Sequence, residues 1–228
     1  MAIDGVETSC AINLLARLLP DSGAPPADQL AASDRDALLA ALHRQCWGDR
    51  IVTTLTCQAC EKLFDLSFEL SAVQRHLVAN SSSWHPDGAG NISDESGATI
   101  RVPRFIDEAG AATLGPRAGA RSLAERCGIS PDTMEAAGAG LESAAPIIDL
   151  ELAARCADCG HAQTAHFDVQ SFVLQRLLNE RNGLLAEIHL LASTYGWSLQ
   201  DILSLTRSTR RRLATGIENA HIQWSARR

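Results

Sequence analysis

Apolar positions recur every three to four residues near both ends of the chain, which predicts amphipathic helices there. A first helix is expected over residues 5–19, ending before Pro20. Its apolar side would carry Val6, Cys10, Leu14, Leu15 and Leu18. A second helix is expected to open with a capping box of Ser33 and Asp36 and to end at Gly48.

The period changes to two after this second helix, which predicts strands. Residues 51–56 are rich in β-branched side chains, and residues 63–70 alternate apolar with polar positions. Cys57-Gln-Ala-Cys60 lies between them. The segment therefore predicts a β-hairpin with a C-x-x-C pair at its tip, leading into a short helix capped by Ser71 and Gln74.

The same unit recurs later in the chain. Cys156-Ala-Asp-Cys159 lies 99 positions after the first cysteine pair, and strand-like segments at 147–155 and 162–169 flank it. This copy also leads into a helix. The shared cysteine spacing indicates a repeat rather than a coincidence.

A segment rich in glycine and proline, residues 80–145, separates the two copies and holds nine of the sixteen glycines and four of the eight prolines. We expect a polar loop over 80–97, a short segment over 100–106, and helices near 119–127 and 131–144.

The strongest helical pattern follows the second hairpin. Its apolar side carries Val173, Leu177, Leu184, Ile188, Leu191 and Tyr195. Gly196 is the expected left-handed residue after this helix. Ser198 and Asp201 form a second capping box, with Trp197 and Ile202 placed as a hydrophobic staple around it. We therefore expect a sharp corner between two helices at Tyr195, Gly196, Trp197 and Ser198.

These patterns predict an α+β fold that is mainly helical, with two β-hairpin zinc knuckles joined in one site and a C-terminal helical corner. The segments we expect are N-terminal helices (1–48), a first knuckle with its helix (49–80), an insertion (81–145), a second knuckle (146–169) and a C-terminal helical region (170–228).

Two C-x-x-C knuckles on two hairpins are typical of a tetrahedral four-cysteine zinc site, because each tight turn supplies two thiolates. We expect one structural zinc ion per chain in a zinc-ribbon-like site with the ligands Cys57, Cys60, Cys156 and Cys159. Four thiolates leave no position for water, so catalytic zinc is disfavoured. A redox C-x-x-C normally opens a helix, whereas strands flank both motifs here. Two knuckles that never meet, or reduced buried thiols, stay open as alternatives.

Other residues near these motifs have a simpler interpretation. His161 and His166 flank the second knuckle and either could replace a cysteine ligand, although a surface position is commoner. Cys10, Cys46 and Cys127 are expected to be buried thiols, as free cysteines usually are.

Charge is distributed unevenly. The net charge is −7, which disfavours sequence-independent nucleic-acid binding, yet residues 207–228 hold six arginines against one acidic residue. This predicts either a solvated helix face or a partner-binding face made by Arg207, Arg210, Arg211 and Arg212.

No Walker loop, H-E-x-x-H or G-x-S-x-G motif is present in the sequence, so we expect a protein that is not an enzyme. The sequence shows no secretory signal and no run of about 18 apolar residues, so we expect a cytoplasmic protein without a membrane span.

The C-terminal run resembles a known family. Residues 185–205, with their Tyr-Gly-Trp-Ser corner and Ile-Leu-x-Leu helix, followed by Arg210-Arg-Arg, are similar to the T4-type small baseplate and baseplate-hub assembly proteins of contractile phages and extracellular contractile injection systems. The larger, zinc-knuckled members are also similar in Gly48-Asp-Arg-Ile, in Ile100-Arg-Val-Pro and in the second C-x-x-C-G.

The resemblance implies a non-enzymatic structural or assembly component of the baseplate of a phage tail or injection system. Its partners would be other baseplate and hub proteins, and it would be cytoplasmic during assembly or part of the finished virion or injection particle. The alternative is a cytosolic zinc-ribbon adaptor that binds nucleic acid or another protein complex.

Overall fold

The computed structural model describes residues 5–19, 25–79 and 84–225. The chain divides into two compact units, residues 1–174 and residues 175–228, and each is described by itself. The fold is α+β and mainly helical, with small antiparallel sheets, as the sequence predicts. The five-segment division stays a prediction.

Unit 1 contains most of the elements. Its helices are α1 (Gly5–Leu18), the 3₁₀ turn η1 (Ala27–Gln29), α2 (Ala32–Trp47), α3 (Leu70–Ala79), α4 (Phe105–Ala112), α5 (Pro116–Arg126), η2 (Pro131–Thr133), α6 (Met134–Ala144) and the start of α7 (Val169–Tyr195). Its strands are β1 (Arg50–Thr56), β2 (Leu63–Glu69), β3 (His85–Pro86), β4 (Asn91–Ser93), β5 (Thr99–Arg101), β6 (Asp149–Arg155) and β7 (Ala162–Asp168).

The two cysteine hairpins, β1–β2 and β6–β7, repeat the same backbone. Arg50 pairs with Glu69 in the first, and Asp149 pairs with Asp168 at the equivalent place in the second. The helix that follows each hairpin is also joined in the same way. The N–H of Leu70 donates to the Asp49 carbonyl, and the N–H of Val169 donates to the Ile148 carbonyl, both at 3.0 Å. Equivalent residues of the two copies are therefore 99 positions apart throughout, from the residue before each hairpin to the first residue of the helix after it.

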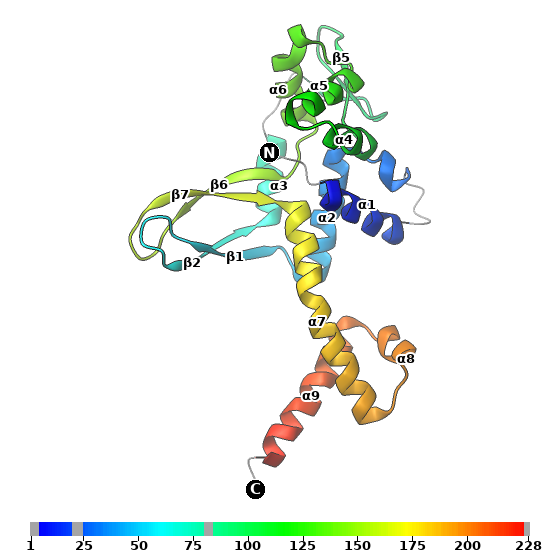
Figure 1. Cartoon of the computed structure of the whole chain (residues 1–228), viewed down its shortest axis with the longest axis vertical. Coiled ribbons are helices and arrows are strands. Elements are labelled where there is room, and N and C mark those ends of the chain that lie inside the picture. Colours follow the sequence, from blue (N-terminus) through cyan, green and yellow to red (C-terminus); the bar gives the residue numbers. More distant parts are fainter. Residues whose placement is uncertain (1–4, 20–24, 80–83, 226–228) are drawn as a thin grey trace. The chain divides into compact units, whose positions relative to one another are not determined.

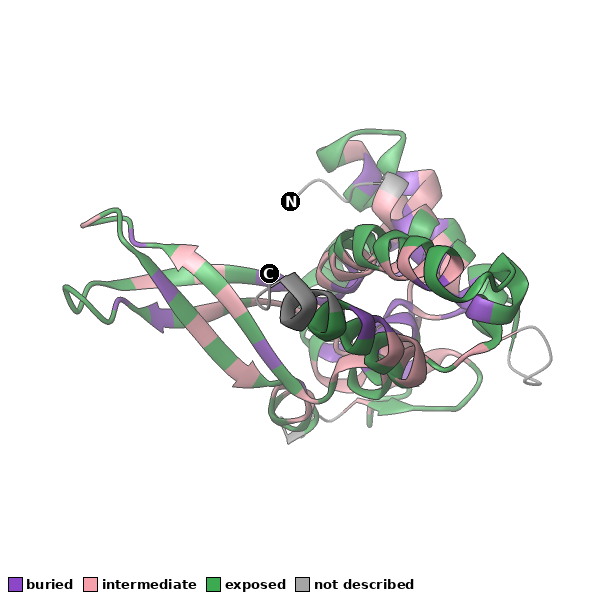
Figure 2. Cartoon of the chain, turned by 90° about the horizontal axis from the view of Figure 1, so that it is seen from below, coloured by how far each residue is buried: buried purple, intermediate pink, exposed green. Residues whose placement is uncertain are grey.

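The two hairpins lie side by side with their tips at the same end (Figure 1). Near the helices, the rings of Phe68 and Phe167 meet edge to face with centroids 5.0 Å apart. Towards the tips, Phe64 and Ala154 are buried beside Cys57 and Cys156. Buried and exposed residues alternate along these strands (Figure 2), because successive side chains of a strand point to opposite faces.

The insertion between the hairpins has a core of its own, formed by Ile92, Ile100, Val102, Ala124, Cys127, Ile129 and Ala137. The helices expected near 119–127 and 131–144 are present as α5 and as η2 with α6. The polar loop expected over 80–97 is wrong for its described part, since β3 and β4 lie there and form a three-stranded sheet with β5, in which β4 is the central strand. These strands have two or three residues each, too short for a period of two to be recognised.

The caps expected at the two early helices are corrected by the structure. Helix α2 begins at Ala32, and its N-cap residue, Ala31, makes no side-chain cap. Asp36 is buried and instead accepts from the Ile148 N–H at 2.8 Å. At α3, Asp49 takes the capping role, since its carboxylate accepts from the N–H of Ser71 at 2.9 Å.

A buried ion cluster joins α2 to α4. Arg35 donates to Asp36 at 3.1 Å and to Glu108 at 2.5 Å, and all three side chains are nearly inaccessible to solvent. Burial raises the pKa values of Asp36, to about 6, and of Glu108. Because charges removed from water must be paired, this cluster fixes the approach of the two helices.

Unit 2 consists of the remainder of α7, α8 (Leu199–Ser204) and α9 (Arg207–Ser225). Helix α7 ends at Tyr195, and Gly196 follows with φ of +69°. Ser198 caps α8, since its hydroxyl accepts from the Asp201 N–H and the Asp201 side chain accepts from the Ser198 N–H. The corner expected from the sequence is therefore present. Its buried centre is formed by Leu191, Ile202 and Ile217.

Candidate metal centre

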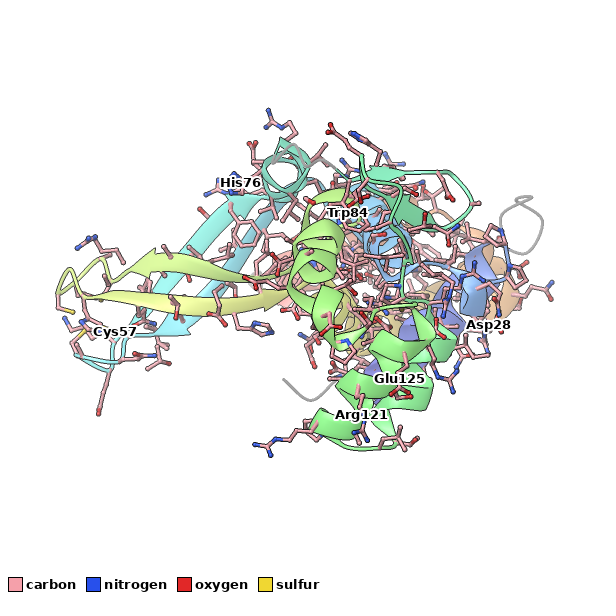
Figure 3. The ribbon with its side chains drawn as sticks, turned by 90° about the horizontal axis from the view of Figure 1, so that it is seen from above. Asp28, Cys57, His76, Trp84, Arg121 and Glu125 are labelled. Atoms are coloured by element: carbon pink, nitrogen blue, oxygen red, sulfur yellow. The ribbon has the colours of Figure 1, made fainter. Side chains whose placement is uncertain are left out.

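The four cysteines of the hairpin tips lie in one cluster, with their sulfur atoms all within 4.8 Å of one another. The Sγ atoms of Cys57 and Cys159 are 3.6 Å apart, and those of Cys60 and Cys156 are 3.8 Å apart. These separations are far longer than a disulfide bond of about 2.05 Å. A tetrahedral ion with sulfur at about 2.3 Å requires sulfur–sulfur separations of about 3.8 Å. The cluster is thus of the size to hold a metal ion. Figure 3 shows Cys57, one of its members, at the hairpin tips.

The same backbone turn presents the cysteines in both knuckles. The Cys57 N–H donates to the Lys62 carbonyl, and the Cys156 N–H donates to the His161 carbonyl, each at 2.9 Å. The turn closes through Glu61 in the first knuckle and Gly160 in the second. Both residues have positive φ, +58° at Glu61 and +73° at Gly160. The second knuckle therefore has the residue that this conformation favours, and the first does not.

Backbone N–H groups prepare the first knuckle for a thiolate. The N–H groups of Cys60 and Ala59 point at the sulfur of Cys57 and lower the pKa of that thiol to about 6. The N–H of Lys62 also favours a Cys60 thiolate, but burial and the neighbouring sulfur atoms outweigh it and raise the pKa of Cys60 to about 12. Because a metal binds the thiolate form of cysteine, a bound cation would replace the thiol protons.

Residues outside the cysteine motifs join the two tips. Gln163 accepts from the Gln58 N–H at 3.0 Å and donates to the Thr56 carbonyl at 3.2 Å, so its amide bridges the hairpins in both directions. Lys62 pairs with Asp158 at 3.2 Å across the same gap. The sequence analysis did not predict this role of Gln163. The signal for it was weak, since Gln163 is only a polar residue at the position where the first hairpin has the apolar Phe64.

The two neighbouring histidines are not among the clustered side chains. His161 is exposed, and His166 contacts Asp149 and Glu151 at 3.3 and 3.4 Å. The three other cysteines lie outside the cluster, and Cys46 is partly buried. Cys127 is buried as expected, whereas Cys10 is exposed on α1.

Two of the four cysteines are buried and two are more accessible. Cys57 and Cys156 are only 1% and 2% exposed, whereas Cys60 is partly buried and Cys159 is exposed. With four sulfur ligands and a closed coordination sphere, a bound ion would hold the two hairpins together and would not activate water.

The structure pairs three of the four arginines proposed as a partner face with glutamates of their own unit. Arg207 and Arg211 contact Glu180, the latter at 3.3 Å, and Arg210 contacts Glu187 at 2.7 Å. The side chain of Arg210 is only 12% exposed. Arg212 is exposed. Partner binding by this face stays a prediction, but three of its members already fasten α9 to α7.

No family model, curated protein or solved structure matches the chain. Among the described residues, no helix has both the length and the apolar character needed to cross a membrane.

Proposed function

We propose that this protein is a non-enzymatic structural or assembly component of the baseplate of a contractile phage-tail-like particle, and that one structural zinc ion fastens its two hairpins. The observation that carries the metal part is the clustering of Cys57, Cys60, Cys156 and Cys159 from segments 99 positions apart. Four thiolates at two tight turns are the ligand set that zinc prefers for a structural site.

Zinc in this place would act on folding rather than on chemistry. The two hairpins form separate two-stranded sheets. An isolated two-stranded hairpin is marginally stable in water, so an ion shared by both tips converts its binding free energy into folding free energy. A rigid pair of arms is useful to a protein that must hold neighbours at fixed positions.

The baseplate part of the proposal rests on the resemblance of residues 185–205 and Arg210-Arg-Arg to the small baseplate proteins. The order of α7, the corner, α8 and α9 supports this, because the pattern of that family is a long helix, a Tyr-x-Trp-Ser-type corner, an Ile-Leu-x-Leu helix and an arginine pair on a last helix. A nucleic-acid adaptor is less well supported, because Lys62 at the tips is paired with Asp158 and Arg155 donates to the Gly160 carbonyl.

Metal content tests the first part. Purified protein should contain one zinc ion per chain in sulfur coordination, as measured by elemental analysis and X-ray absorption. Cys57→Ser and Cys159→Ser should lower zinc content and stability to a similar extent, because each removes a ligand from the same ion. Cys10→Ser, a change at an exposed thiol outside the cluster, is the matched control and should leave both unchanged. A harmless Cys159→Ser beside a damaging Cys57→Ser would rule out a shared site.

Co-sedimentation tests the second part. A tagged copy expressed in its native host should sediment with sheath-and-tube particles or with their assembly intermediates. Deletion of the gene should leave tails without complete baseplates. Intact particles in normal numbers from the deletion strain would contradict the proposal.

A further inference from the structure

Among the described side chains of unit 2, more large apolar ones are exposed than buried. Its buried cluster holds Leu191, Ile202 and Ile217. Its exposed large apolar residues are Leu178, Leu185, Tyr195, Trp197, Leu199 and Leu203. Exposed apolar side chains that share one face of a helix can mark an interaction site.

Helix α7 arranges part of this surface as a stripe. Leu178 and Leu185 are one heptad apart and therefore lie on the same face of the helix, with exposed fractions of 60% and 53%. Asn182 lies between them and is also exposed. The spacing of four and then three residues is the seam on which a second helix packs its side chains. The stripe is distinct from the side that carries Leu184 and Ile188, which are partly buried.

The charged residues near the stripe indicate which kind of partner helix could bind there. Both acidic residues of α7 in this unit, Glu180 and Glu187, are paired with arginines of α9. Arg181 is exposed next to the leucines. Residues 175–228 contain eight arginines against four acidic residues. The stripe therefore consists of two exposed leucines on either side of Asn182, with Arg181 beside them, within a unit whose sequence holds more arginines than acidic residues.

We propose that the stripe of Leu178, Asn182 and Leu185 docks an acidic amphipathic helix of a partner protein. Leucines of that helix would fill the seam, and its flanking glutamates would meet Arg181, whose planar guanidinium binds carboxylates in a bidentate manner. A second copy of this unit fits less well, since it would bring like charges together. The inference rests on the proposed function in one respect: the partner is sought among the baseplate proteins.

Two synthetic peptides test this with the zinc-loaded, full-length chain. One is a three-heptad amphipathic helix with leucine at its seam positions and glutamate beside them, and the other has lysine in place of glutamate. Fluorescence anisotropy should show the acidic peptide binding about tenfold or more tightly than the basic one. The preference should shrink as salt is added, because exposed charges are screened.

Variants assign the binding to the stripe. The double change Leu178→Ala with Leu185→Ala should weaken acidic-peptide binding about tenfold. Arg181→Glu should invert the preference between the two peptides. Leu114→Ala, at an equally exposed leucine of unit 1 (52%), is the control and should change nothing. Circular dichroism of each variant verifies that the helices remain.

Four results would overturn the inference: no peptide binding, equal binding of both peptides, binding unaffected by the leucine variants, or a dimer that light scattering detects and the leucine variants dissociate. The last would identify a second copy as the occupant. A chain that behaves as expected with the peptides but never sediments with particles would overturn the baseplate function and leave this docking surface in place.

Discussion

The two knuckles offer an internal comparison, because one backbone conformation is occupied by Glu61 in the first and by Gly160 in the second. Both residues have positive φ. This conformation costs a residue with a side chain about 1–2 kcal/mol, since its Cβ crowds the neighbouring carbonyl oxygen. A Cβ added at Gly160 would meet no other atom within 4 Å, so the backbone conformation alone determines the cost.

Gly160→Ala should therefore lower the free energy of unfolding by up to about 1.5 kcal/mol, because the smaller freedom of alanine in the unfolded chain offsets about 0.5–1 kcal/mol of the strain. Glu61→Gly should remove the cost of the positive φ, about 1–2 kcal/mol, from the folded state. Against this, the greater freedom of glycine in the unfolded chain costs about 0.5–1 kcal/mol of stability. The net effect of Glu61→Gly is then a stabilisation of between zero and about 1.5 kcal/mol. The two substitutions at equivalent positions should have opposite signs.

Urea denaturation at saturating zinc, with zinc content verified for each variant, measures these differences. Gly138→Ala is the matched control, because an added Cβ there also meets nothing within 4 Å, but the residue lies within helix α6. It should raise stability by about 0.5–1 kcal/mol. The reasoning is refuted if Gly160→Ala and Gly138→Ala change stability in the same direction, or if Glu61→Gly destabilises as much as Gly160→Ala.

Three further predictions concern the corner, the arginine face and the buried ion cluster. Ser198→Ala should cost about 0.5–2 kcal/mol in denaturant unfolding, since it removes the cap of α8, and an unchanged midpoint would contradict the cap. Arg210→Glu should separate α9 from α7, because it places a carboxylate against Glu187 where water has little access. Arg212→Glu should leave the free energy of unfolding within about 0.5 kcal/mol of that of the natural chain. Equal effects of the two changes, measured by circular dichroism, would contradict the ion pairing. Burial raises the pKa of Asp36 from an ordinary value of 3.8 to about 6. The folded chain therefore holds this proton more tightly than the unfolded chain does. The resulting stabilisation is fully present below pH 3.8 and is lost as the pH rises through about 6. Asp36→Asn should remove that slope between about pH 4 and 6, and identical slopes in the two proteins, measured by denaturation at fixed pH, would refute it.

Local signals in the sequence were enough to determine the two hairpins and the helical corner. A C-x-x-C turn between two alternating strands sets which residues of the strands pair. In the first hairpin Thr56 lies opposite Leu63, and in the second Arg155 lies opposite Ala162 at the equivalent place. The corner at Gly196 and Ser198 is equally local, because a left-handed residue and a capping box act within one turn of the chain.

The tertiary structure alone decided which residues meet across the chain. The four sulfur atoms lie between hairpins that pack through Phe68 and Phe167 and are bridged by Gln163. The spacing of the cysteines does not reveal these contacts. The same holds for Asp36. Its position suggested a helix cap, but burial beside Arg35 and the Ile148 N–H gives it a stronger set of partners far along the sequence. Patterns of period two or 3.6 record which side of an element is apolar. They do not record the partner that a polar side chain finds, since that partner is fixed by packing between distant segments.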